Sequence, residues 1–218
     1  MLLRSPRLIF WDFDGVIKDS VEVKSQAFVQ LFQPYGVGVA ERVRAHHEAN
    51  GGMSRFDKMP RYLEWAGEVA TPERVDQFCR WFSQLARQGV IDAPWVPGAE
   101  AFLRGNPHGQ RFVLVTATPQ DEIEEILAAL SLRACFAAVY GASMSKSEAI
   151  RATLVNRQVD PQRCILIGDA KADWDAALAN HVPFLLRRHA TNVKVFERYT
   201  GDSVEDFAGL TYPNWGRR

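Results

Sequence analysis

The chain has 218 residues and no net formal charge, because 26 Lys and Arg residues balance 26 Asp and Glu residues. This balance excludes nucleic-acid binding that depends on bulk positive charge, and a hydrophobic fraction of 47% is ordinary for a globular protein with a buried core. Because the sequence has no membrane-length apolar run, no signal-peptide pattern and only three scattered cysteines, we expect a reduced, cytoplasmic protein that binds no membrane.

The first predicted strand, residues 7–13, is followed by a long stretch with helical periodicity. Candidate helices are 21–34, 40–49, 55–66, 73–88 and 98–104. One helical crossover needs far fewer residues than separate this strand from the next. The sequence therefore predicts an α-helical insertion over 16–93, carried by a core domain that comprises 1–15 and 94–218.

The remainder of the chain alternates between strand and helix patterns. Short apolar runs predict buried strands at 111–116, 137–140, 163–167 and 182–186, with helices at 119–131, 146–157 and 171–180 between them. Such alternation predicts an α/β fold, with a doubly wound parallel sheet and helices on both faces.

Several polar residues lie at or just beyond the carboxyl ends of the predicted strands, where open α/β sheets bind their ligands. They are Asp12, Asp14, Thr116, Asp169 and Asp173. Crowded carboxylates require a cation, and hard oxygen ligands favour Mg²⁺, beside which a carboxylate can attack phosphorus. Ser145 and Glu148 have capping-box spacing, which predicts that Lys146 lies in the first turn of a helix. Both Lys146 and the N-terminus of that helix would then face the phosphate group of a substrate.

The segments that carry these residues are DFDGVIKDS, LVTATPQ, SKSEAI and GDAKADWDAA, in that order. Together they resemble motifs I to IV of the haloacid dehalogenase superfamily, in its phosphatase and phosphoglucomutase-like branch. The predicted insertion stands where that family has its type 1 helical cap. The resemblance implies a Rossmann-like parallel sheet with a helical cap. Many relatives carry K-P-x-P around the third motif, where this chain has Ser-Lys-Ser-Glu, so the subfamily stays open.

The resemblance also implies a role for each motif residue. Asp12 is expected to be the nucleophile, and Asp14 the general acid and base. Thr116, Ala117 and Lys146 are expected to hold the phosphate. The expected ligands for Mg²⁺ are Asp12, Asp14 through its backbone carbonyl, and Asp169, with Asp173 as a further ligand or as a residue that supports the ligands. Dehalogenases and phosphonatases similar to this chain lack an acid at the position of Asp14, which favours phosphate ester chemistry.

These roles predict a Mg²⁺-dependent phosphatase that hydrolyses a small phosphorylated metabolite through an aspartyl-phosphate. Two alternatives stay open: a phosphosugar mutase, whose intermediate phosphorylates the substrate again, and a relative that binds a phosphorylated ligand with little turnover. Neither the substrate nor the oligomeric state is indicated by the sequence.

Within the insertion, Gly51 and Gly52 precede a helix for which Ser54 is a suitable N-cap. Arg55, at the start of that helix, is a candidate to bind a second anionic group of the substrate; the alternative is an ordinary surface arginine. We expect His46 and His47 at the surface, because adjacent histidines on a helix face different sides and no third metal ligand has suitable spacing. The residues after Arg187 give no chemical signal.

Overall fold

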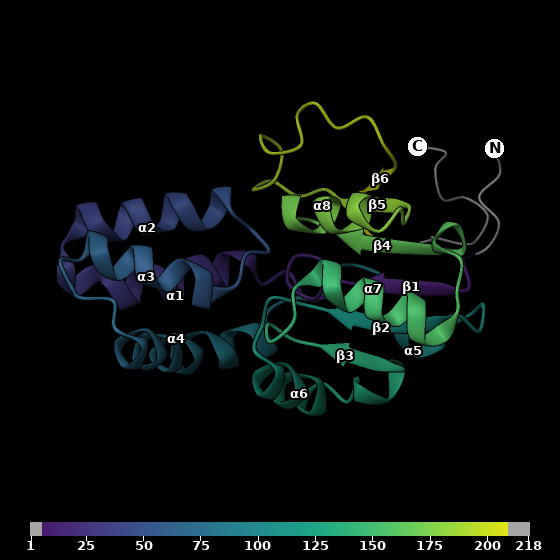
Figure 1. Cartoon of the computed structure of the whole chain (residues 1–218), viewed down its shortest axis with the longest axis horizontal. Coiled ribbons are helices and arrows are strands. Elements are labelled where there is room, and N and C mark those ends of the chain that lie inside the picture. Colours follow the sequence, from purple (N-terminus) through teal and green to yellow (C-terminus); the bar gives the residue numbers. More distant parts are fainter. Residues whose placement is uncertain (1–5, 209–218) are drawn as a thin grey trace.

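A six-stranded parallel sheet forms the centre of the protein in this computed structural model, which describes residues 6–208 (Figure 1). Residues 1–5 and 209–218, at the two ends of the predicted core domain, lie outside the described part. The strands are β1 (Leu8–Trp11), β2 (Arg111–Val115), β3 (Ala138–Tyr140), β4 (Cys164–Gly168), β5 (Phe184–Arg187) and β6 (Ser203–Val204). Their order is β3-β2-β1-β4-β5-β6, so the chain runs outward from β1 in both directions. The carboxyl ends of β1, β2 and β4 therefore meet at the switch point where such sheets bind ligands.

Successive residues of the central strands alternate between two hydrophobic cores. Ile9 and Trp11 face a core with α5 (Ala99–Gly105) and α6 (Gln120–Ala129). Leu8 and Phe10 face the opposite core, which contains residues of α7 (Lys146–Arg157) and α8 (Lys171–Ala179). Because both faces are covered, the strands are apolar throughout rather than alternating with polar residues.

Four helices inserted between β1 and β2 form the cap. They are α1 (Val21–Phe32), α2 (Val37–Ala49), α3 (Arg55–Trp65) and α4 (Pro72–Asp92). These helices bury their own core, rich in aromatic side chains: Phe28, Phe32, Tyr62, Phe78 and Phe82. The strand arrowheads point toward the cap, so the cap stands over the carboxyl ends of the strands (Figure 1). Among the described residues, none of the helices has the length and apolarity that crossing a membrane requires.

The two connections between cap and core run side by side. Asp19 donates its backbone N–H to the carbonyl of Pro94 at 2.8 Å, and Val96 donates to Ile17 at 3.0 Å. Lys18 also makes an isolated β-bridge to Trp95. These backbone contacts hold both linkers next to the end of β1, which places the cap beside the residues that follow this strand.

The predicted fold class is confirmed, and every predicted strand and helix has its counterpart. The sequence did not indicate β6 or the 3₁₀ helices Gln33–Tyr35, Arg133–Cys135 and Pro161–Arg163, each of which has only two or three residues. Elements this short contain too few residues to show a periodicity. The assignment of domain boundaries at residues 16 and 94 remains a prediction.

Candidate active site

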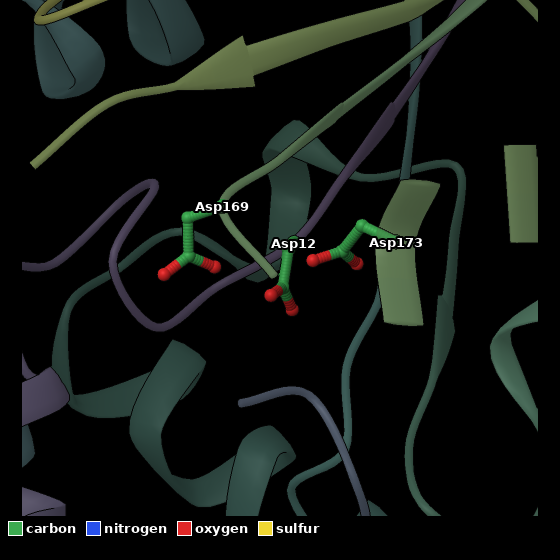
Figure 2. A group of neighbouring side chains, drawn as sticks. All are labelled: Asp12, Asp169 and Asp173. Carbon is green, nitrogen blue, oxygen red and sulfur yellow. The ribbon is translucent and has the colours of Figure 1, made fainter. Parts of the chain in front are cut away.

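Three buried aspartates converge at the carboxyl edge of the sheet. Asp12 directly follows β1, Asp169 directly follows β4, and Asp173 lies in the first turn of α8. One carboxylate oxygen from each lies within 4.8 Å of the others. Figure 2 shows Asp12 between the other two side chains. Asp12 is 4% exposed, Asp169 7% and Asp173 0%, so these side chains are almost completely removed from solvent.

Two glycines allow the backbone to approach these carboxylates. Gly15 has a φ of +74°, and a Cβ there would overlap the Asp169 carboxylate. A Cβ at Gly168 would likewise overlap the side chain of Asp173. The glycine of the Asp-x-Asp-Gly segment thus serves both a left-handed turn and a close contact with the acidic cluster.

Lys146 pairs with two of these three carboxylates. Its Nζ lies 2.9 Å from Asp12 Oδ2 and 2.5 Å from Asp173 Oδ1. As predicted, Ser145 and Glu148 form a capping box that starts α7 at Lys146. The N-terminus of the helix and the ammonium group therefore both present positive charge to the end of β1.

One ammonium group does not neutralise three buried carboxylates. Burial, and next the Asp173 carboxylate, raise the pKa of Asp12 to about 7 despite the opposing effect of Lys146. Burial also raises the pKa of Asp169 and of Asp173. Hard oxygen donors with excess negative charge form the kind of site that Mg²⁺ occupies. The acidic cluster therefore fits the expected cation, with Asp12, Asp169 and Asp173 as its ligands.

Residues beyond β5 hold Asp169 in place. His189 Nε2 lies 2.8 Å from Asp169 Oδ2, and Asn192 donates its side-chain amide to the Asp169 carbonyl at 2.9 Å. Asn192 also donates to the carbonyl of Arg187, which ties the loop to the end of β5. This role could not be predicted from the local pattern, because neither residue belongs to a motif and the contacts span about twenty positions.

The second aspartate of the first motif has different partners. Asp14 accepts a hydrogen bond from Ser20 Oγ at 2.7 Å, forms an ion pair with Lys24 on α1, and accepts from Thr118 Oγ1 at 3.3 Å. Burial alone would raise the pKa of Asp14, but Lys24 and Ser20 lower it below its usual value. The Asp14 carboxylate is not a member of the acidic cluster. The pKa of Asp14 is therefore lowered, whereas that of Asp12 is raised.

A single pocket between core and cap brings most of the predicted site residues together. Its core side includes Asp12, Asp14, Thr116, Ala117, Lys146 and Asp169. Asp173 is fully buried behind it. The Thr116 hydroxyl oxygen accepts from the Thr118 backbone at 3.2 Å, which leaves the hydroxyl proton free to point toward a ligand. On the cap side the pocket is lined by residues of α1, α2, α3 and α4, and by the loop with Gly51 and Gly52: Lys24, Phe28, His47, Arg55, Lys58 and Phe82 are among them.

Arg55 lies in this pocket wall but already has anionic partners. Its guanidinium donates to both carboxylate oxygens of Glu122 on α6 at 2.8 Å and to Ser83 Oγ at 2.6 Å. Arg55 is only 4% exposed, so it is not a surface arginine. Its role toward a substrate stays a prediction. The contacts show that it joins α3 of the cap to α6 of the core.

His46 and His47 are both half-buried, and the expectation of a surface position is wrong for His47, which lines the pocket and packs on Phe28 with ring centroids 4.7 Å apart. Helical spacing alone could not show that α2 turns this side toward the core of the cap. Lys24 and Lys58 were likewise missed, because single lysines on helices are normally solvated.

Sequence comparison agrees with this geometry. The sequence model of the haloacid dehalogenase-like hydrolase family matches residues 9–186. The tyrosine-protein kinase PtkA of Mycobacterium tuberculosis H37Rv is 26% identical over 184 residues, which cover 82% of this chain and 60% of the kinase. The chain thus spans about three fifths of the length of this relative.

Solved structures share the fold over nearly the whole chain. β-Phosphoglucomutase from Clostridium difficile superposes with a TM-score of 0.75 at 20% identity, covering 95% of this chain and 94% of that enzyme. A protein described as a predicted phosphoglycolate phosphatase, from Haemophilus somnus 129pt, gives 0.73 at 16% identity, with 94% and 96% covered. At these identities the likeness establishes the architecture of sheet and cap alone.

Removal of one carboxylate tests the metal site. Mg²⁺ should raise the melting temperature of the wild type, more at mildly alkaline than at mildly acidic pH, because protons and metal compete for Asp12 near its pKa of about 7. Asp173→Asn should weaken Mg²⁺ binding by roughly tenfold or more. Thermal shift titrations and calorimetry would measure both effects.

Asp175→Asn is the matched control, because Asp175 lies on the same helix but is exposed and pairs with Lys171. It should bind Mg²⁺ like the wild type. Equal Mg²⁺ binding by the wild type and by Asp173→Asn would contradict the assignment of Asp173 as a ligand.

Proposed function

The chain belongs to the haloacid dehalogenase-like hydrolases, and we propose that within this family it is a Mg²⁺-dependent phosphatase of small phosphorylated metabolites. One observation carries the proposal: a pocket at the carboxyl edge of the sheet brings Asp12 and Asp169 of the acidic cluster together with Asp14, Thr116 and Lys146. The two aspartates of the first motif can then take different tasks: Asp12, beside the expected Mg²⁺, attacks phosphorus, and Asp14, outside the acidic cluster, transfers protons. Without a metal the pKa of Asp12 is raised and that of Asp14 is lowered, so the attack requires both Mg²⁺ beside Asp12 and proton uptake by Asp14.

Asp12 is the proposed nucleophile. It directly follows β1, and its carboxylate is fixed by Lys146 at 2.9 Å. When ionised, a carboxylate oxygen of Asp12 attacks phosphorus, the bond to the leaving oxygen breaks, and an aspartyl-phosphate forms. Mg²⁺ bound by Asp12, Asp169 and Asp173 would neutralise the phosphoryl oxygens and keep Asp12 ionised near neutral pH.

Thr116 and Lys146 are the proposed phosphate holders, with Ala117 beside them in the pocket wall. The Thr116 hydroxyl can donate to one phosphoryl oxygen, while Lys146 supplies a positive charge from the start of α7. Because both positions are fixed by secondary structure, the donors need little rearrangement when charge develops on the phosphoryl oxygens.

Asp14 is the proposed proton carrier. In the first step the protonated carboxyl gives its proton to the leaving alkoxide, and in the second the carboxylate takes a proton from the water that attacks the aspartyl-phosphate. The contacts with Lys24 and Ser20 suit the second step, because they stabilise the ionised form. The first step therefore requires Asp14 to gain a proton against the effect of Lys24.

The cap supports hydrolysis of a small molecule in particular. It stands over the carboxyl ends of the strands, and all four of its helices contribute side chains to the pocket. A pocket enclosed in this way limits the size of the leaving group and excludes bulk water until the product leaves. Measurement of free phosphate separates hydrolysis from the mutase alternative, in which the phosphoryl group returns to the substrate.

Substitution of the two aspartates tests their proposed roles. Asp12→Asn should abolish phosphate release from every ester, because the nucleophile is lost. Asp14→Asn should slow alkyl ester hydrolysis by roughly 10²–10⁴-fold, and slow hydrolysis of an activated aryl ester less, because that leaving group needs no proton. Asp19→Asn, in the same loop with a half-exposed side chain, is the control and should remain active. Equal losses on alkyl and aryl esters would exclude Asp14 as the leaving-group acid.

The pH profile tests the link between Lys24 and Asp14. Leaving-group protonation requires protonated Asp14, so kcat/KM for an alkyl phosphate should fall as pH rises through the pKa of this group. Because Lys24 lowers that pKa, Lys24→Met should raise it and move the descending limb to higher pH. The exposed Lys194→Met is the control. A limb that stays in place, or moves to lower pH, would show that Lys24 does not set the protonation of Asp14.

A further inference from the structure

A buried lysine, Lys58, lies at the cap end of the pocket. Lys58, on α3, is 2% exposed and lines the same pocket as Asp12. Its Nζ lies 3.0 Å from His47 Nδ1. Within residues 6–208 no carboxylate forms an ion pair with it, although Lys24, Arg55 and Lys146, which line the same pocket, each have one. Burial of a cation without a compensating anion is unfavourable, so this arrangement needs a physical explanation.

The neighbours of Lys58 increase this imbalance. Burial, followed by the charges of Lys24 and Arg55, lowers the pKa of Lys58 to about 7. Burial and Lys58 also hold the pKa of His47 well below its usual value, so the imidazole is neutral. A neutral His47 accepts from Lys58 through Nδ1 and carries its proton on Nε2. The pair therefore orients the Lys58 amino group without supplying negative charge. With a pKa of about 7, Lys58 is partly deprotonated near neutral pH, and an anion bound beside it would favour the charged form.

We propose, on the basis of the phosphatase function above, that Lys58, oriented by His47, binds a second anionic group of the substrate. The substrate is then a small phosphomonoester that carries a carboxylate or a second phosphate at its other end. The transferred phosphate lies against Asp12, Thr116 and Lys146 on the core side of the pocket. The second anion lies against the cap and restores the charge balance around Lys58.

The remaining lining of the pocket agrees with a substrate of this class. Val21, Phe28 and Phe82 supply apolar side chains, which offer no hydrogen bonds to a row of hydroxyl groups. The protein would then distinguish substrates by the charge at the end remote from the transferred phosphate rather than by the pattern of their hydroxyl groups. Arg55, the candidate from the sequence, has both arms of its guanidinium on Glu122, so it is less able than Lys58 to accept a second anion.

Matched substrate pairs test the proposal. One arm compares alkyl phosphates of two, three and four carbons with phosphorylated hydroxy acids of the same lengths, in which a carboxylate replaces the terminal methyl group. A second arm uses the bisphosphates of the corresponding terminal diols, which distinguishes a carboxylate from a phosphate as the second anion. In at least one arm and at one chain length, the wild type should release phosphate with a higher kcat/KM from the ester that carries the second anionic group than from the simple alkyl phosphate.

Lys58→Met should remove most of this preference, by roughly 30-fold or more, because a buried charge pair loses its cation. Lys194→Met, at an exposed position, should retain the preference. If Lys58→Met lowered kcat/KM by the same factor for esters with and without the second anionic group, that result would assign Lys58 to the packing of the cap and overturn the proposal. So would a wild type without any preference at all lengths in both arms, a result that does not depend on the folding of a variant.

Calorimetry separates this proposal from the proposed function. If the wild type hydrolyses none of these esters yet binds the anionic members more tightly in a Lys58-dependent manner, the phosphatase function is wrong and the anion site stands. If it hydrolyses esters with and without the second anionic group equally well, the phosphatase function stands and the anion site is wrong.

Discussion

Repulsion among three buried carboxylates is the constraint on which the structure of this site depends. Asp12, Asp169 and Asp173 are brought together at one sheet edge, where a single ammonium, that of Lys146, pairs with Asp12 and Asp173. Such an arrangement is unfavourable unless a cation completes it, and in the proposed function that cation brings a phosphoryl group close to Asp12. Neighbouring residues make this close approach of carboxylates possible. Gly15 and Gly168 leave space for the side chains, the capping box positions Lys146, and His189 contacts Asp169.

The cap supplies the opposite charge. Its helices direct cations into the pocket, and most of these are paired with carboxylates of the core. Lys24 reaches Asp14 and Arg55 reaches Glu122, so the same ion pairs that neutralise charge also join cap to core. Arg87 on α4 adds an exposed pair with Glu125 on α6, which contributes little by itself. Movement of the cap would break the buried pairs, so the position of the cap and the protonation of Asp14 are physically coupled.

Much of the fold could be predicted from local sequence, because buried parallel strands read as apolar runs and the helix starts carry their own caps, as at Ser145 and Ser54. The motif residues could be placed for a similar reason, since each stands directly after a strand or at a helix start. The partners of these residues could not. Lys24 with Asp14, Arg55 with Glu122 and His189 with Asp169 meet only through tertiary packing, and nothing in the local sequence distinguishes Lys58 from a solvated lysine.

The central claim is that Asp12 carries the phosphoryl group during turnover, and trapping that intermediate is the most direct test. The wild-type enzyme would be mixed with Mg²⁺ and an aryl phosphate, quenched within one turnover and analysed by mass spectrometry after reduction of the acyl phosphate. The account predicts modification at Asp12 alone, which disappears at the rate at which free phosphate forms. Continued phosphate release with an unmodified Asp12, or with the phosphoryl group on another residue, would contradict it.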